Sequence, residues 1–570
     1  MTRLARRIQA RRDEQAAFRG LTYAFLIAVA GGIALTLEHG YRDTLLSEWA
    51  LGTMQITFPW LAMVSARDVR WRELSSKRYT SRTAPVAEVG LALAAFALIF
   101  GSEVVPACAA AIAFVVYGIR FQSMLARRLR NAALLFPASF LFLIIASASL
   151  LLLPVATPPD QPIEVVDAVF TATSAVCVTG LSVRDTASGF TPFGQAVIFA
   201  SIQLGGLGVM IFGSTLAMLF GSRLSVREHL TLSNAIEEHP RERLSRYAYF
   251  IVLTTLVLEA IGAVVLFASW PPDDTGLGQR AWGSVFHSVS AFCNAGFDIT
   301  GQSMIGVRSE LAPFVGIVPM IVLGGLGFVV LEDVYTMARD RLRRKAQPRR
   351  LSTHTRVVLV TTAVLLVGGF VVIFIAQASQ SGDVSSQTAL DAAFMSVTAR
   401  TAGFTCVPME ELSPGSRFAL LALMTIGGSP GSTAGGMKTV VFAMLVLAVI
   451  STVRKRDEVE VFGRALPDAI VKRAATVLFG LFGVIACATF ALDLTERIPF
   501  EPLLFEVTSA ATTTGLSLGA TDQLSEAGRL IVALTMYLGR VGALAVLAGL
   551  VGGAGEGVHY ALPRDSVSLG

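Results

Sequence analysis

The sequence has little charge and none of the motifs that enzymes or metal sites usually show. Only 15% of its 570 residues are charged, 53% are hydrophobic, and the mean hydropathy is +0.63. The five cysteines lack C-x-x-C spacing, the six histidines are scattered, and no nucleotide-binding P-loop occurs. These absences argue against a zinc site, a disulfide framework and an enzyme, and no covalently bound cofactor is expected.

Long apolar runs are what the sequence has instead. Each of them is close to the length of about twenty residues that a helix needs to cross a hydrocarbon core. They recur along the whole chain, for example at 134–153, 251–270, 357–376 and 474–492. The period-two alternation of a membrane β-barrel is missing. The sequence therefore predicts an all-α integral membrane protein, surrounded by the lipid bilayer, with about twelve crossings.

Basic and acidic loops alternate between the apolar runs. The basic loops are 67–82, 120–130, 223–246, 339–350 and 454–473, and the N-terminus is also basic. The positive-inside rule places these segments in the cytoplasm and the acidic or neutral loops outside. The net charge of +5 then reflects orientation and contact with lipid headgroups, and no nucleic-acid partner is needed to explain it.

Four segments share one pattern, in which a Phe precedes a short Ser/Thr/Ala run and then a Gly followed by Leu or Phe. They begin at Phe170, Phe286, Phe394 and Phe505 and recur about every 110 residues, which is too long for a solenoid repeat. Each semi-polar stretch of about ten residues is too short to cross the membrane. We expect four re-entrant loops, whose helix C-termini would point partial negative charge at a central cavity that favours cations.

A loop that presents consecutive backbone carbonyls to an ion needs φ angles that a Cβ opposes, which is a reason for glycine. For any one of these glycines, close helix packing or an ordinary turn is the better explanation. Four glycines in equivalent contexts favour the carbonyl-lined loop.

The segments VTGL (178–181), SAFCNAGF (290–297), TARTAGF (398–404) and TTTGL (512–516) resemble the Trk/Ktr/HKT superfamily of potassium transporters. The resemblance covers roughly residues 134–553 and implies four M1–pore loop–M2 modules around a central pseudo-fourfold pore. It implies potassium uptake across the membrane, with K⁺ bound at filter carbonyls. The compact loops and the lack of a eukaryotic targeting signal predict the plasma membrane of a bacterium, its inner membrane. The implied filter residues are Val178, Thr179, Gly180, Asn294, Ala295, Gly296, Thr401, Ala402, Gly403, Thr513, Thr514 and Gly515.

The transported ion is K⁺ by this resemblance, because a serine at the first filter glycine accompanies sodium preference in the plant branch and this chain has Gly180. Two alternatives stay open. One is a sodium- or proton-coupled K⁺ symporter, and the other is a Na⁺-conducting member of the same superfamily.

A stretch rich in Gly, Ser and Thr, residues 426–438, interrupts an apolar run of the third module. A helix cannot run smoothly through it. A simple kinked helix is the alternative, whereas the resemblance implies an intramembrane gating loop. The implied gate residues are Gly427, Gly428, Ser429, Gly431, Gly435, Gly436, Lys438 and Arg540.

Arg540 lies within the last apolar span, where a charged side chain needs a cavity or a partner. Its candidate partners are Glu259, Glu332 and Asp333. The other reading is an arginine that snorkels to the interface.

The expected organisation has six parts. They are an N-terminal extension of about four transmembrane helices (1–133), pore modules at 134–222, 247–340, 354–453 and 472–553, and a cytoplasmic tail (554–570). No βαβ pattern occurs that could form a nucleotide-binding regulator. The resemblance implies a homodimer and a separate cytosolic nucleotide-binding regulatory subunit.

Overall fold

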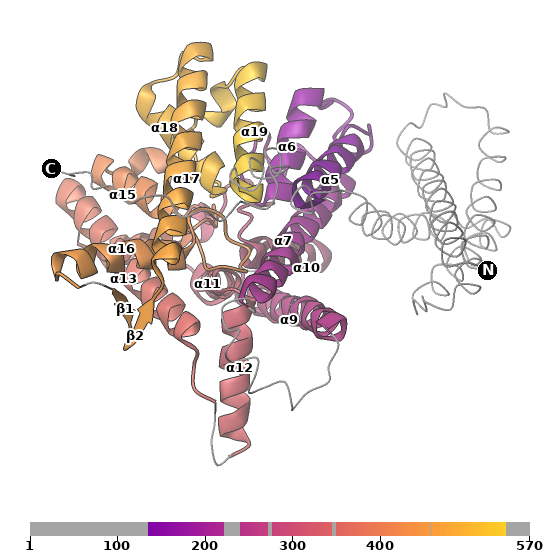
Figure 1. Cartoon of the computed structure of the whole chain (residues 1–570). Helices are drawn as coiled ribbons and strands as arrows, with labels where there is room; N and C mark the ends of the chain where they lie inside the picture. The colour runs from indigo at the N-terminus through magenta and orange to yellow at the C-terminus, as the bar shows by residue number, and fades with distance from the viewer. Residues whose placement is uncertain are drawn as a thin grey trace, which may run out of the picture.

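The computed structural model describes residues 135–221, 240–271, 276–344, 349–382, 384–456 and 458–542 (Figure 1). The N-terminal helices expected in 1–133 and the tail expected in 554–570 lie outside these residues. Nearly all of the described secondary structure is helical, and the two strands form one short antiparallel hairpin of β1 (Val459–Val461) and β2 (Arg464–Leu466).

The helices form four consecutive units, and each unit has a first helix, a shorter second helix and a third helical segment. Unit 1 contains α5 (Leu135–Leu151), α6 (Val165–Cys177) and α7 (Pro192–Gly221). Unit 2 contains α9 (Pro240–Ser269), α10 (Leu277–Cys293), a π-helical turn η3 (Pro313–Ile317), α11 (Val318–Leu326) and α12 (Phe328–Leu342).

Units 3 and 4 follow the same order. Unit 3 contains α13 (Thr353–Ser381), α14 (Ser386–Thr398), α15 (Pro414–Thr425) and α16 (Thr439–Val453). Unit 4 contains α17 (Asp468–Thr495), α18 (Phe500–Thr512) and α19 (Glu526–Val541). Three single 3₁₀ turns lie in the connections, namely η2 (Ile305–Val307), η4 (Met409–Glu411) and η5 (Thr521–Gln523).

The first helices of units 2, 3 and 4 can cross a membrane. The described residues contain three helices that are long and apolar enough, Tyr249–Ser269, Thr353–Gln380 and Ala469–Thr495. A fourth candidate is the pair α11 and α12, which bends by 100° at Gly327. Large apolar side chains such as Val264, Val364 and Phe479 are more than half exposed on these helices, as expected where a helix faces lipid.

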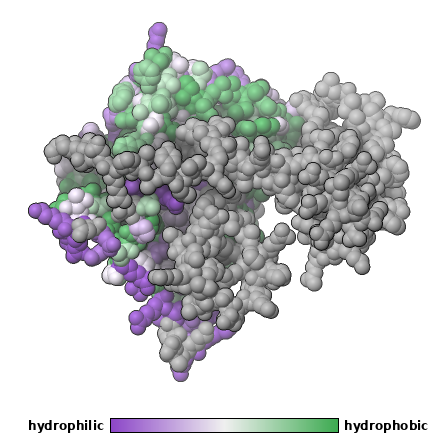
Figure 2. Space-filling view, in the orientation of Figure 1, coloured by the Kyte–Doolittle hydropathy of each residue, from purple (hydrophilic) through white to green (hydrophobic). Residues whose placement is uncertain are grey.

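Hydrophobic and hydrophilic surfaces are separated in the space-filling view. Hydrophobic residues cover much of the upper described part in Figure 2, and hydrophilic residues gather at the lower end, where α12 and the β1–β2 hairpin lie in Figure 1. This separation indicates which part of the molecule contacts lipid and which end lies in water.

The short second helices α6, α10, α14 and α18 are the buried centre of the fold. Their C-terminal halves consist almost entirely of buried residues. Glycines on three third helices let the last carbonyls of the short helices approach closely. A Cβ on these glycines would lie about 2 Å from a carbonyl oxygen, for Gly205 from Val176 (2.0 Å), for Gly324 from Phe292 (1.9 Å) and for Gly539 from Ala511 (2.2 Å).

We predict that Gly205→Ala destabilises the protein, because its new methyl group would overlap the Val176 carbonyl. Overpacking of this kind costs about 1–3 kcal/mol or more. The matched control is Gly483→Ala in α17, where an added Cβ meets nothing within 4 Å and helix propensity favours Ala by about 1 kcal/mol. Thermal unfolding in detergent should show a lower midpoint for Gly205→Ala alone, and equal midpoints would contradict this packing.

Candidate functional site

The loops that follow the four short helices have the same unusual backbone. A non-glycine residue adopts a positive φ at the start of each loop, at Val178 (56°), Asn294 (57°), Thr401 (69°) and Thr513 (51°). Two residues later, a glycine again has a positive φ, at Gly180 (94°), Gly296 (69°), Gly403 (83°) and Gly515 (92°). Such angles are costly for residues with a Cβ and turn successive carbonyls in directions that a strand or helix does not allow.

The four glycines close a ring, which we call the glycine ring. Each glycine lies against the backbone carbonyl that precedes the glycine of the next unit, so that a Cβ would overlap the oxygen. An added Cβ would lie 2.5 Å from the Ala295 oxygen on Gly180, 2.8 Å from the Ala402 oxygen on Gly296, 2.6 Å from the Thr514 oxygen on Gly403 and 2.3 Å from the Thr179 oxygen on Gly515. The last contact returns to unit 1, and the order around the ring is therefore 1–2–3–4.

A hydroxyl group on each short helix forms a hydrogen bond with the backbone of the ring loop in its unit. It lies four residues after the repeated Phe, at Ser174, Ser290, Thr398 and Ser509. In units 1 and 4 the hydroxyl accepts a hydrogen bond from the glycine N–H, with 3.1 Å from Gly180 to Ser174 and 3.0 Å from Gly515 to Ser509.

In units 2 and 3 the same hydroxyl donates to the carbonyl after the glycine, with 2.8 Å from Ser290 to Phe297 and 2.7 Å from Thr398 to Phe404. The sequence pattern included these residues only as part of a Ser/Thr/Ala run. Their fixed spacing from the Phe is the signal that could have identified them.

Several buried oxygens beside the ring have no hydrogen-bond partner. They include the side-chain oxygens of Thr179, Asn294 and Thr513. Unpaired buried oxygens are uncommon in proteins and call for an explanation. Oxygen atoms are also the groups that replace the hydration shell of a hard cation.

Residues 426–438 form a non-helical segment between α15 and α16, which we call the 426–438 loop. The loop bonds directly to residues of the ring loops. Asn294 Nδ2 donates to Thr433 Oγ1 at 2.9 Å, and the Gly435 N–H donates to Thr401 Oγ1 at 3.2 Å. Thr433 Oγ1 in turn donates to the Phe292 carbonyl at 3.0 Å. The loop therefore packs against one side of the glycine ring.

The other side of the loop follows the bend between α11 and α12. Backbone bonds join the Ser429 N–H to the Gly325 carbonyl (2.9 Å) and the Phe328 N–H to the Gly431 carbonyl (3.3 Å). The loop also folds tightly on itself, because a Cβ on Gly427 would lie 1.9 Å from the Gly435 carbonyl. A Cβ on Gly428 would lie 2.6 Å from the Ala434 Cβ, and Gly436 has a φ of 62°.

Three cationic side chains donate to carbonyls of this loop. Arg540 Nη1 bonds to the Thr433 carbonyl, Lys438 Nζ to Ala434 (2.6 Å) and Arg400 Nη2 to Gly427 (2.8 Å). Arg400 and Arg540 are only 8% and 7% exposed. Cations at such a position need hydrogen bonds or a wet cavity, and loop carbonyls supply the bonds.

Two of the three acidic partners suggested for Arg540, Glu259 and Asp333, bond elsewhere. Glu259 accepts from Gln203 Nε2 at 3.1 Å, and Asp333 accepts from the Ser352 N–H at 2.9 Å. Arg400 was not recognised from the sequence as a contact of the loop, although it stands inside the TARTAGF segment.

Comparison with known proteins identifies the family. The family model for TrkH, described as a cation transport protein, matches residues 110–551. The chain belongs to the TrkH family. As a member of a cation transport family it is a transporter and not an enzyme, as the sequence predicted. Membership also makes it a membrane protein in contact with lipid.

Curated relatives of this TrkH-family chain are about one third identical to it. The potassium/sodium uptake protein NtpJ of Enterococcus hirae is 34% identical over 445 residues, which cover 76% of this chain and 96% of the relative. The Ktr system potassium uptake protein B of Vibrio alginolyticus is 35% identical over 437 residues, 76% of this chain and 93% of the relative.

The fold is also that of a solved TrkH protein. The crystal structure of the potassium transporter TrkH from Vibrio parahaemolyticus superimposes with a TM-score of 0.61 at 18% identity, over 88% of this chain and 97% of that one. The predicted all-α membrane fold of the Trk/Ktr/HKT type is thereby confirmed.

We predict that the double variant Ser174→Ala/Ser509→Ala destabilises this TrkH-family protein. It would leave the Gly180 and Gly515 N–H groups without their acceptors, and an unpaired buried donor costs about 1–3 kcal/mol. Ser149→Ala is the control, because this exposed hydroxyl bonds only within its own helix. Differential scanning fluorimetry should show a lower midpoint for the double variant, and no difference from the control would contradict the anchoring role.

Proposed function

We propose that the chain takes up potassium ions across the plasma membrane of a bacterium, its inner membrane, and that the glycine ring is its selectivity filter. The observation that carries the proposal is the closed ring of glycines, each pressed against a carbonyl of the next unit. Relatives at about one third identity are named potassium uptake proteins. The filter would consist of the three ring-loop residues of each unit, from the positive-φ residue to the glycine.

The filter would act by replacing water with oxygen. An entering K⁺ ion would lose its hydration shell to the carbonyls of the ring loops, among them those of Thr179, Ala295, Ala402 and Thr514. The C-termini of α6, α10, α14 and α18 end at these loops, and their partial negative charge would favour a cation. The membrane potential would then drive the ion inward in a channel-like manner.

The gate in this proposal is the 426–438 loop together with Lys438 and Arg540. In the described conformation the loop is bonded to Asn294 and Thr401 of the ring loops, which would close the pathway on its cytoplasmic side. Opening would have to break these bonds and the bonds from the three cationic side chains. Unwound backbone at this depth is tolerated where it lines a wet cavity.

A sodium-carrying role is the second candidate, because one relative is named a potassium/sodium uptake protein. Coupling of K⁺ entry to Na⁺ or H⁺ is a further form of this candidate. Both would use the same ring and differ in how far the filter discriminates between the ions.

We further propose that the protein works as a homodimer with a separate cytosolic nucleotide-binding regulatory subunit. The hydrophilic end formed by α12 and the β1–β2 hairpin is a suitable surface (Figure 2). Exposed arginines occur there at Arg341, Arg454 and Arg464. The names of several relatives refer to a Ktr system with lettered proteins. In the proposed organisation, the pore modules occupy 134–222, 247–340, 354–453 and 472–553.

The uptake proposal predicts a selective ion flux in purified protein. Influx of radioactive rubidium into liposomes, driven by a K⁺ gradient, should fall when external K⁺ is added and be nearly indifferent to Na⁺. Gly180→Ser should reduce this discrimination, because its side chain would overlap the Ala295 carbonyl at a φ of 94°. Equal competition by K⁺ and Na⁺ in the original protein would instead support the sodium candidate, and an unaltered ratio in the variant would place selectivity elsewhere.

The gate proposal predicts a larger flux when the loop is shortened. Deletion of residues 427–436 should raise rubidium influx severalfold, because the bonds to Asn294 and Thr401 are lost. Arg540→Gln, which weakens the bond to the Thr433 carbonyl, should raise it less. An unchanged flux in both variants would show that the loop does not limit conduction.

A further inference from the structure

One position of the repeat differs in all four units although it lies beside the filter. The residue directly after the repeated Phe is Thr171, His287, Met395 or Glu506. The segment that leaves the ring has Ser182, Asp298, Thr405 or Ser517 two residues after the ring glycine. We call it the exit segment of each unit. Neither position was singled out by the repeat pattern, because neither has a common residue type.

In units 2 and 4 these two positions bond to each other. His287 Nε2 lies 2.7 Å from Asp298 Oδ1, and Ser517 Oγ donates to Glu506 Oε2 at 2.6 Å. Both pairs are separated by 11 residues in the chain. His287 and Glu506 are 1% and 0% exposed. The two bonds therefore join a short helix to the exit segment at the same place in two units.

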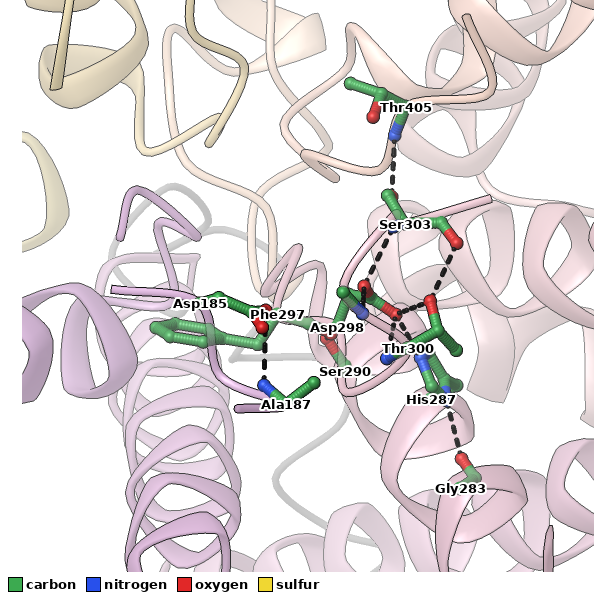
Figure 3. A network of polar contacts seen from close by, with 11 residues as sticks. Asp185, Ala187, Gly283, His287, Ser290, Phe297, Asp298, Thr300, Ser303 and Thr405 are labelled. Atoms are coloured by element: carbon green, nitrogen blue, oxygen red, sulfur yellow. Dashed lines mark hydrogen bonds and ion pairs between the residues drawn. The ribbon is translucent and has the colours of Figure 1, made fainter. Parts of the chain in front are cut away.

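Asp298 forms hydrogen bonds beyond the one with His287 of α10, as Figure 3 shows. Its carboxylate accepts hydrogen bonds from the N–H groups of Thr300 (2.9 Å), Gly301 (2.9 Å) and Ser303 (2.8 Å). Ser303 Oγ then accepts from the Thr405 N–H at 3.0 Å (Figure 3). The carboxylate of unit 2 is thus connected to the exit segment of unit 3.

The Asp298 carboxylate keeps its charge. It lies in the connection between α10 and η2, outside the spanning helices. Burial by itself would raise the pKa of Asp298, but the hydrogen bonds from His287 and Thr300 outweigh burial and lower the pKa to about 2. Asp298 therefore stays ionised, as an acceptor for the N–H groups shown in Figure 3, at the pH values at which transport is assayed.

Unit 4 has a smaller network of the same design. The Glu506 carboxylate accepts from the hydroxyls of both Ser517 and Thr521, and Ser517 Oγ accepts from the Gly519 N–H at 3.1 Å. Buried carboxylates are stable where hydrogen bonds satisfy their oxygens.

Units 1 and 3 differ at this point in the part of the chain that the structure describes. The hydroxyl of Thr171 has no hydrogen-bond partner, and Met395 offers no donor. Because the ring order is 1–2–3–4, units 2 and 4 stand opposite each other across the axis.

We propose that the His287–Asp298 and Glu506–Ser517 bonds are struts that fix the spacing of the ring carbonyls and thereby set ion discrimination, with all four residues acting as positioning residues. This inference rests on the proposed function of the ring as a potassium filter. The ring loops carry two positive-φ residues each, and the segments that leave the ring are neither helix nor strand at Ser182, Asp298, Thr405 and Ser517. An exit segment that has lost its bond to the short helix would let the ring carbonyls shift. Discrimination between K⁺ and Na⁺ depends on the spacing and number of these carbonyls.

The test uses two serines at the same position of the repeat. Ser517→Ala removes the hydroxyl that bonds to Glu506, whereas Ser182→Ala removes a hydroxyl in unit 1 that faces no such partner at Thr171. The measurement is the competition of K⁺ and Na⁺ for rubidium influx in liposomes containing the full chain. This ratio does not change when fewer molecules are active.

We expect Ser517→Ala to lower the K⁺ over Na⁺ discrimination about tenfold, in line with the loss of one buried hydrogen bond. Ser182→Ala should leave it unchanged. Glu506→Gln keeps an oxygen acceptor for Ser517 and should retain most of the discrimination. Asp298→Ala should lower it further than Ser517→Ala, because Asp298 also supports unit 3.

The outcomes separate this inference from the proposed function. If the unaltered protein does not discriminate between K⁺ and Na⁺, the filter proposal fails, and the struts fail with it. If the unaltered protein discriminates and Ser517→Ala keeps the same ratio as Ser182→Ala, the strut proposal alone is overturned. Should Asp298→Ala not purify as a monodisperse protein, the serine pair decides the matter by itself.

Discussion

The close approach between a glycine and the carbonyl of the next unit is the contact on which the rest of this structure depends. It occurs four times, and in each case a Cβ would lie 2.8 Å or less from the oxygen. The glycines must also hold a positive φ, which other residues adopt at a cost. The short helices, their hydroxyl anchors and the glycines on the third helices all serve to bring four such contacts together.

The 426–438 loop shows how an irregular backbone can be held by hydrogen bonds inside this protein. Its N–H and carbonyl groups pair with ring residues, with the bend at Gly327 and with the side chains of Arg400, Lys438 and Arg540. These partners come from three different units. Protein groups therefore supply the hydrogen bonds of the loop in the described conformation, and a movement of the loop would have to break them.

Features that repeat along the chain could be predicted from the sequence, whereas the long-range partners of single side chains could not. The family, the helical membrane fold and the equivalence of the four glycine segments follow from apolar length and from a motif found four times. The partner of Arg540 is a carbonyl 107 residues away, and its identity has no composition signal. The His287–Asp298 pair was equally hard to find, because its two positions carry different residue types in the four units and no common motif marks them.

The ring is built from one chain, and this has a consequence for how it can change. In a ring made from four identical subunits, every substitution appears four times and alters all quadrants at once. Here Thr171, His287, Met395 and Glu506 occupy one position of the repeat with four different chemistries. Each quadrant can accumulate its own substitutions, so that a single base change alters one side of the glycine ring while the other three stay as they were.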